Sequence, residues 1–266
     1  MIAASHVRQA RRVPVAIPLA IGGAWVLSVV AQASGRASLL NHGALIEGTP
    51  LRTPPPLWLA LPLFLLAWQV MVVAMMLPSS LPMVRLFRAT SARAERPAAT
   101  MAGFLGGYLG VWGSFGAIAF AQDIGIHRLV DRSAWLAQHS WLIGASALAL
   151  AGAFQFSALK DRCLTECRHP AAYLLQHYRR GVANGFRLGF GHGMFCLGCC
   201  WALMLLMFAA GVAQLWWMAA LTGLMVYEKV GRNGDRLTPV AGALLLTLAA
   251  VVLVHPHWLP PVFSGA

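Results

Sequence analysis

The residues best suited to chemistry lie in the stretch GHGMFCLGCCW, residues 191–201. On a helix of 3.6 residues per turn, His192, Cys196 and Cys199 are four and three positions apart and form one stripe, with Cys200 beside it. A single buried cysteine usually acts as a small hydrophobic residue. Three cysteines and a histidine on one side of one helix instead indicate a metal site or a redox site.

A second cysteine pair, Cys163 and Cys167, is also four positions apart and shares one face if the segment is helical. Pro170 is predicted to end that helix, because proline lacks the amide donor and clashes with the preceding turn. All five cysteines are expected to be free thiols, since none falls in a predicted outside loop and structural disulfides belong to oxidising compartments. We interpret this pair as an entry or docking site.

The segment MVVAMMLPSSLPM, which begins at Met71, supplies thioethers at the end of a predicted span. Met71 and Met75 share one helix face, and Met76 lies beside Met75. Methionine often only fills gaps in a core, so the stripe matters because we expect it at the depth of the cysteines. Pro78 and Pro82 are predicted to break the helix there and to free backbone carbonyl groups.

The ligand types indicate which metal would bind. Thiolate and thioether groups are soft ligands that suit Cu(I) best, then zinc or an iron–sulfur cluster. The spacing does not fit a structural zinc module with two paired-ligand knuckles. No haem-attachment pattern, glycine-rich phosphate loop or Ser-His-Asp arrangement is present, so we assign no catalytic residue. We expect copper, with zinc or iron as alternatives, at a site formed by His192, Cys196, Cys199, Cys200, Met75, Met76, Cys163 and Cys167, with Glu228 and Met71 nearby.

The composition indicates a membrane protein. Charged residues make up 11% of the chain, against roughly 25% in soluble domains. The apolar residues fall in runs of about twenty, long enough to cross a hydrocarbon core of ~30 Å as helix. We predict one all-α transmembrane domain over residues 1–266 with about seven spans. These are residues 13–33, 57–80, 101–122, 140–159, 188–211, 213–228 and 238–255.

The basic residues predict the orientation of the chain. With the amino terminus in the cytosol and the carboxy terminus outside, sixteen of the twenty lysines and arginines fall on cytosolic segments. This is the positive-inside asymmetry, and it explains the net charge of +12 without nucleic acid as a partner. We expect a multi-pass protein of a bacterial inner membrane. Its expected partners are the lipid bilayer and a metal ion, with a small metallochaperone or a membrane enzyme complex as further candidates.

Most segments between the spans are expected to be loops. Residues 34–56 and 123–139 are predicted as outside loops, and residues 85–98 as a basic inside loop. Residues 160–187 are predicted as a longer inside segment, with a short amphipathic helix around Tyr173.

Glycines spaced four apart predict close helix packing, because small residues at that spacing let two backbones approach. They occur in the third and fifth predicted spans, and we read them as packing positions and not as ligand sites. They are Gly103 with Gly107, Gly106 with Gly110, and the series Gly185, Gly189 and Gly193.

Two further features bear on the path of a metal. Glu228 lies beside Lys229 at the end of the sixth predicted span, either as an interfacial ion pair or as part of the site. Beyond Cys200, the fifth span offers only the thioethers of Met204 and Met207. We therefore expect a path from the cytosolic face to near the midplane, and not an open pore. Transport stays open as an alternative if these two thioethers face the bundle interior.

The chain resembles a little-characterised bacterial family of predicted metal-binding integral membrane proteins, sometimes labelled copper chaperones. The resemblance covers roughly residues 57–245. It rests on AMMLPSSLPM (74–83), LKDRCLTECRHP (159–170), GHGMFCLGCCWALM (191–204) and the Glu228–Lys229 pair. Family members typically have TPLK before the first cysteine pair, where this chain has SALK. The resemblance implies metal handling and names no reaction.

Three functions are compatible with these observations. The leading hypothesis is copper handling (delivery, insertion or transport) through a Cys/His/Met site that opens to the cytosol, in which case the protein is not an enzyme. The second is a thiol-based or quinone-linked membrane oxidoreductase, because the C-x-x-C spacing of Cys196 and Cys199 can form a reversible disulfide. The third is a scaffold or assembly subunit, with the glycine-rich third span docking a partner helix.

Overall fold

The computed structural model describes residues 13–34, 45–46, 55–209 and 214–255. Within these ranges every regular element is a helix and no strand occurs, which confirms the all-α prediction. The predictions for the two chain ends and for most of the outside loop 34–56 concern residues outside these ranges.

Five described helices are long and apolar enough to cross a membrane. They are α2 (Ala16–Ala33), α4 (Leu57–Met75), α6 (Pro97–Arg132), α11 (Val182–Ala209) and α13 (Gly234–Val254). A sixth candidate combines α8 (Trp141–Phe154) with α9 (Ala158–Arg168), whose axes differ by 64°. The predicted sixth span, residues 213–228, corresponds to α12 (Leu215–Val230), whose 16 residues fall short of the ~20 needed for a straight crossing. The exact number of spans therefore stays a prediction.

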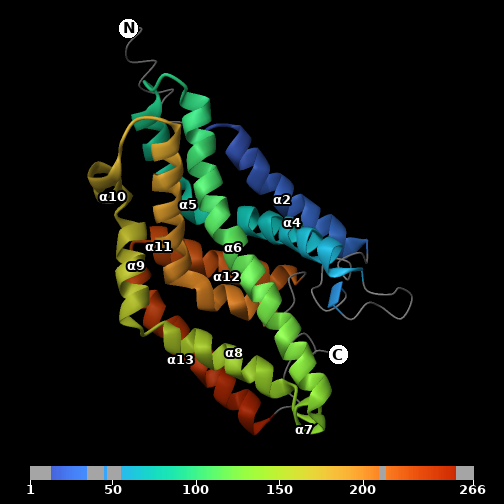
Figure 1. The fold of residues 1–266 in the computed structure, drawn as a ribbon. Helices are drawn as coiled ribbons and strands as arrows, with labels where there is room; N and C mark the ends of the chain where they lie inside the picture. The colour runs from blue at the N-terminus through green and yellow to red at the C-terminus, as the bar shows by residue number, and fades with distance from the viewer. Residues whose placement is uncertain (1–12, 35–44, 47–54, 210–213, 256–266) are drawn as a thin grey trace.

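Two helix pairs form the body of the molecule. α6 packs along α11, and α8 packs along α13 (Figure 1). α11 also contacts α8 and α9, so it joins the two pairs. The turn between α8 and α9 arises at Ser157, whose side chain accepts a hydrogen bond from the backbone amide of Lys160 (3.1 Å) and so begins a new helix.

The glycines explain the closeness of α6 and α11. A Cβ atom on Gly107 would collide with the backbone carbonyl of Phe186, and one on Gly189 would collide with that of Phe104. Backbone atoms cannot swing aside as side chains can, so only glycine fits at these contacts. The close-packing prediction is therefore confirmed for this face. The other predicted pair, Gly106 and Gly110, faces open space.

The structure corrects two predictions about where helices end. Residues 123–139 are not a loop, because α6 continues to Arg132 and α7 (Ala134–Gln138) follows. Polar residues can continue a helix when their side chains interact across a turn. In α6, Asp123 and His127 form such a pair at 3.5 Å. The predicted basic loop 85–98 is also partly helical, since α5 (Leu77–Ser91) runs into it.

The prolines after the second span act differently from each other. The predicted break occurs at Met76, between α4 and α5, and Pro78 occupies the first turn of α5, where its missing amide costs nothing. Ser79 donates a hydrogen bond to the backbone carbonyl of Met76 (2.8 Å), which satisfies a group that the break frees. The prediction of a second break at Pro82 is wrong, because α5 continues through it.

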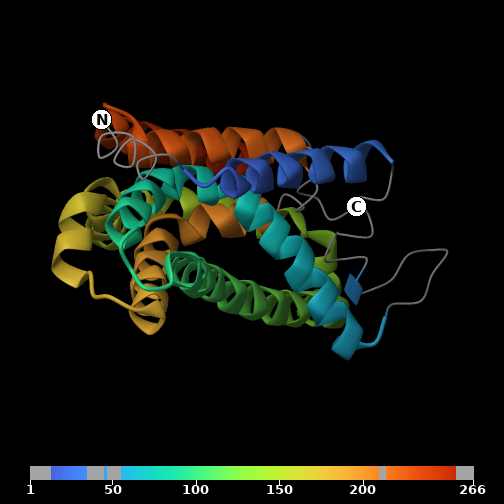
Figure 2. The ribbon, with the colours of Figure 1, turned by 90° about the horizontal axis from the view of Figure 1, so that it is seen from above.

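α9 and α10 (Pro170–His177) lie together at one side of the molecule (Figures 1 and 2). As predicted, α9 ends just before Pro170, and a short amphipathic helix follows with Tyr173 and Leu174 buried and Leu175 exposed. α12 contacts α9, α11 and both halves of the broken α4–α5 helix. The junction of these elements is where the predicted ligands meet.

Candidate functional site

The cysteine stripe of α11 faces the helix bundle. The side chains of Cys196, Cys199 and Cys200 are at most 1% exposed, and His192 is 4% exposed. The prediction that His192, Cys196 and Cys199 point into protein and not towards lipid is therefore confirmed. Burial of this kind allows the soft and polar groups of one helix to meet partners from others.

The first contact between helices is the one between Cys199 of α11 and Cys167 of α9. Their sulfur atoms are 4.0 Å apart, and Cys167 is only partly buried. The second cysteine of the α9 pair therefore adjoins the stripe and is not a separate outer site. Cys163 does not take part in the same way, because its sulfur lies against Gly198, where an added Cβ would come within 2.5 Å of it.

The second contact between helices is the one between Cys200 of α11 and Met76. The thiol of Cys200 lies 3.7 Å from the thioether sulfur of Met76, which occupies the break between α4 and α5. Met71 and Met75 are buried as well, but among the described residues Met76 is the methionine whose sulfur lies against a cysteine thiol. The broken helix thus brings one of the three predicted methionines to the cysteines.

Lys229 is the principal residue that sequence reasoning named only as the neighbour of Glu228 and did not count among the site residues. Its ammonium group reaches Cys196 (3.1 Å), Cys200 (3.8 Å) and the hydroxyl of Ser79 (3.1 Å). Lys229 is 6% exposed, so this cation lies inside the protein beside the sulfur atoms. Its signals in the sequence were the Glu228–Lys229 pair of the family resemblance and its place at the end of an apolar run, and that place also fits an ordinary anchoring charge.

Tyr108 of α6 adds a polar contact on the other side of Cys196. Its hydroxyl lies 3.2 Å from the sulfur of Cys196 and accepts a hydrogen bond from Ser80 (3.1 Å). No pattern in the sequence pointed to this tyrosine, because it lies within the glycine-rich third span. Cys196 is therefore held between a phenol and an ammonium group.

Glu228 pairs with Lys160 and not with its neighbour Lys229. The ammonium group of Lys160 lies 2.8 Å from Glu228 Oε2 and donates to the backbone carbonyl of Cys199 (3.1 Å). Consecutive residues on a helix point ~100° apart, which explains why Glu228 and Lys229 have different partners. The interfacial Glu228–Lys229 pair considered from the sequence is therefore wrong, and a buried ion pair takes its place.

His192 lies among aromatic rings. The rings of Phe104, Tyr108 and Tyr173 have centroids 6.2, 5.8 and 6.3 Å from the imidazole. Burial raises the pKa of Tyr173 to about 12, so its phenol is uncharged at physiological pH. The buried Nε2 atom of His192 has no hydrogen-bond partner among the described residues. In the tautomer that carries its proton on Nδ1, this nitrogen offers a lone pair to a ligand.

The thiols of Cys199 and Cys200 also donate to the backbone carbonyl of Cys196, at 3.1 and 2.8 Å. The sulfur of Cys199 therefore contacts the backbone carbonyl of Cys196 and the sulfur of Cys167. No contact between the sulfurs of Cys196 and Cys199 is recorded among the described residues. Across the described ranges, no three His, Cys, Asp or Glu side chains converge closely enough to enclose a metal ion. The arrangement consists of two pairs of soft atoms with a lysine beside them.

Comparison with known proteins agrees with this chemistry. No curated protein matches the chain, and no solved structure does. One family model, PpoB2, described as a copper chaperone, matches residues 65–252. The match includes the second half of α4, all of α5, the five cysteines, and Lys160 and Lys229. Because it covers well over half of the sequence, the chain belongs to this copper chaperone family.

Proposed function

We propose that the protein binds Cu(I) as cargo at the two pairs of soft atoms and passes it on from the cytosolic half of the membrane. The observation that carries this proposal is the 4.0 Å separation of the Cys167 and Cys199 sulfurs. Two metal–sulfur bonds of ~2.3 Å, the length found at zinc, span at most ~4.6 Å. One metal ion therefore fits between these sulfurs with little movement of α9 or α11.

The second pair supplies a next position for the ion. Cys200 and Met76 are 3.7 Å apart, and they offer one thiol and one thioether, a combination that favours Cu(I) over harder metals. Cys196 lies about one helical turn before both Cys199 and Cys200 on α11. Stepwise exchange from one sulfur to the next would then move the ion inward without releasing it into the apolar bundle. His192 is proposed as an additional ligand near the start of this path.

The direct test is the copper content of protein purified without oxygen. We expect Cys167→Ser and Cys199→Ser each to lose bound Cu(I). Cys163→Ser is the matched control, because it changes a cysteine of the same helix whose sulfur lies against Gly198. Full copper content in the Cys167→Ser, Cys199→Ser double variant would refute the proposed site. A stable protein that binds zinc and no copper would refute the proposed cargo.

The proposal includes an orientation in the membrane. We propose seven spans with the amino terminus in the cytosol of a bacterial cell and the carboxy terminus outside, since this placement puts sixteen of twenty basic residues inside. α9 and α10 are then cytosolic, and the site opens on that side. Reporter fusions after residues 90 and 175 should indicate the cytosol. A cytosolic carboxy terminus would remove one span and reverse the direction of the last helices.

Transport across the membrane is a second candidate function, favoured by one observation. Met204 and Met207 are both fully buried on α11, where they continue the stripe of Cys196 and Cys200 towards the outer half. Flux of Cu(I) into vesicles that contain the purified protein separates the two functions. Robust flux that Met204→Leu and Met207→Leu abolish would make the protein a transporter, whereas binding without flux supports delivery.

A further inference from the structure

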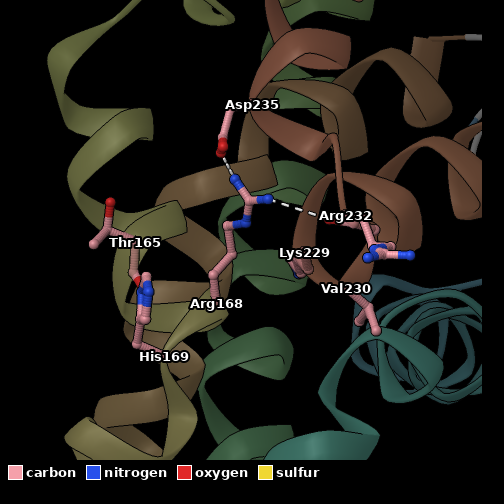
Figure 3. A pocket seen from close by; sticks show the side chains of 8 residues that line it. Thr165, Arg168, His169, Lys229, Val230, Arg232 and Asp235 are labelled. Carbon is pink, nitrogen blue, oxygen red and sulfur yellow. Dashed lines mark hydrogen bonds and ion pairs between the residues drawn. The ribbon is translucent and has the colours of Figure 1, made fainter.

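A cavity of about 390 Å³ opens where α9, α12 and the start of α13 meet (Figure 3). Its volume is within the ~300–1,000 Å³ found for small-molecule sites. The lining is mostly polar. One wall is formed by the end of α9, and the other by the end of α12 and the start of α13: Thr165, Arg168, His169, Lys229, Val230, Gly231, Arg232 and Asp235. Several of these residues are exposed, so the cavity is accessible from solvent.

The charge of the lining favours an anion. Arg168 is already engaged, because it pairs with Asp235 and donates to the backbone carbonyl of Gly231 (3.2 Å). Arg232 is exposed, and no ion pair is recorded for it among the residues that the structure describes. With Asp235 neutralised, Arg232 leaves the cavity with a positive charge that a carboxylate can meet through charge-assisted hydrogen bonds.

The cavity adjoins the sulfur atoms through Lys229. This residue belongs to the cavity lining, and its ammonium group contacts Cys196 and Cys200. On the opposite wall, Arg168 directly follows Cys167, which is partly buried and close to Cys199. No cysteine lines the cavity, but a ligand in it contacts Lys229, which separates it from Cys196 and Cys200, and Cys167 lies one residue from the lining residue Arg168 on α9.

We propose that this cavity binds a small anionic thiol that carries Cu(I), with Arg232 holding its carboxylate. The proposal rests on the function proposed above and names the form in which the metal arrives. Copper moves by ligand exchange: a bond forms between copper and the Cys167 sulfur, and the bond between copper and the carrier sulfur breaks. The proton of the Cys167 thiol passes to the released carrier thiolate, so no oxidant or reductant is needed.

The test compares two Cu(I) donors that differ in charge. One is the Cu(I) complex of glutathione, a tripeptide thiol with two carboxylates, and the other is the Cu(I) complex of the neutral thiol 2-mercaptoethanol. We expect Arg232→Ala to slow loading from the glutathione complex about tenfold, in line with the loss of a hydrogen bond between charged groups, and to leave loading from the neutral complex unchanged. Arg236→Ala is the matched control, because it removes an exposed arginine outside the cavity.

A second measurement needs no metal. S-methylglutathione keeps the carboxylates but cannot bind copper through a thiolate, and its equilibrium binding should weaken in Arg232→Ala and not in Arg236→Ala. Equal loading of wild type and Arg232→Ala from the glutathione complex would overturn the proposal, as would a lack of S-methylglutathione binding. If neither donor loads the wild-type protein but S-methylglutathione still binds through Arg232, the proposed function fails and the anion site stands.

Discussion

The ammonium group of Lys160 lies 2.8 Å from Glu228 and 3.1 Å from the carbonyl oxygen of Cys199, so one buried side chain joins α9, α11 and α12. Lys160 is 1% exposed and Glu228 is 2% exposed. This junction holds α9 against α11 at the level where Cys167 approaches Cys199. The Lys160–Glu228 ion pair therefore positions the sulfurs of Cys167 and Cys199 without contacting either of them.

Breaking this ion pair should destabilise the protein. Lys160→Met leaves the buried Glu228 carboxylate without its cation, which we expect to lower the free energy of unfolding by about 3–5 kcal/mol. Denaturant unfolding in detergent measures the change. The double variant Lys160→Met, Glu228→Leu should recover most of the loss, because no charge is left unpaired. A single variant as stable as wild type would show that the pair does not stabilise the junction.

Substitution of Met76 should weaken Cu(I) binding more than substitution of its neighbour Met75. Met76→Leu keeps the volume of the side chain but removes the thioether next to Cys200, so we expect Cu(I) binding about tenfold weaker, at the low end for the loss of a metal-site partner. Competition with a Cu(I) chelator measures the affinity. Met75→Leu is the control, since Met75 is fully buried without a recorded sulfur contact. Equal effects of the two changes would contradict the assignment of Met76.

Two glycines of α6 provide a matched test of helix packing. Gly107→Ala forces a methyl group into the backbone of α11, and we expect a loss of about 1–3 kcal/mol from overpacking. Gly106→Ala adds the same methyl group in open space, and it should be neutral or stabilise the helix by up to ~1 kcal/mol. Unfolding in detergent distinguishes the two. If Gly107→Ala were as stable as Gly106→Ala, α6 and α11 would not be in close contact.

Tyr108 should contribute to stability and not to metal binding. Tyr108→Phe removes the hydroxyl that lies between Ser80 and Cys196, and the loss of this buried contact should cost about 1 kcal/mol. Tyr227→Phe is the control, because Tyr227 is 45% exposed. Copper content should stay at the wild-type level in both variants. A Tyr108→Phe protein that folds normally but lacks copper would instead make this tyrosine part of the binding site.

Local features of the sequence were sufficient to predict the helical class and the faces that carry the ligands. Four of these features depend only on neighbours along the chain. They are the apolar runs of membrane length, the end of α9 before Pro170, the four-residue spacing of the glycines, and the spacing of His192, Cys196 and Cys199. Helix periodicity relates residues within one helix. It placed the histidine and cysteines on one face, and the cost of exposing an imidazole or a thiolate to lipid then predicted correctly that this face is buried. The loop predicted at 123–139 failed because polar residues also form helix when they pair across a turn.

The contacts within the site were decided by tertiary structure alone. Cys167 and Cys199 are 32 positions apart in the sequence, Met76 and Cys200 are 124 apart, and Ser79 and Lys229 are 150 apart. Periodicity shows which residues share a face, but not which helix covers that face or at what height. Those are set by the close approach of α6 and α11, the 64° turn before α9 and the break at Met76. Only these packing relationships bring a lysine, a tyrosine and a methionine from separate helices to the cysteines of α11.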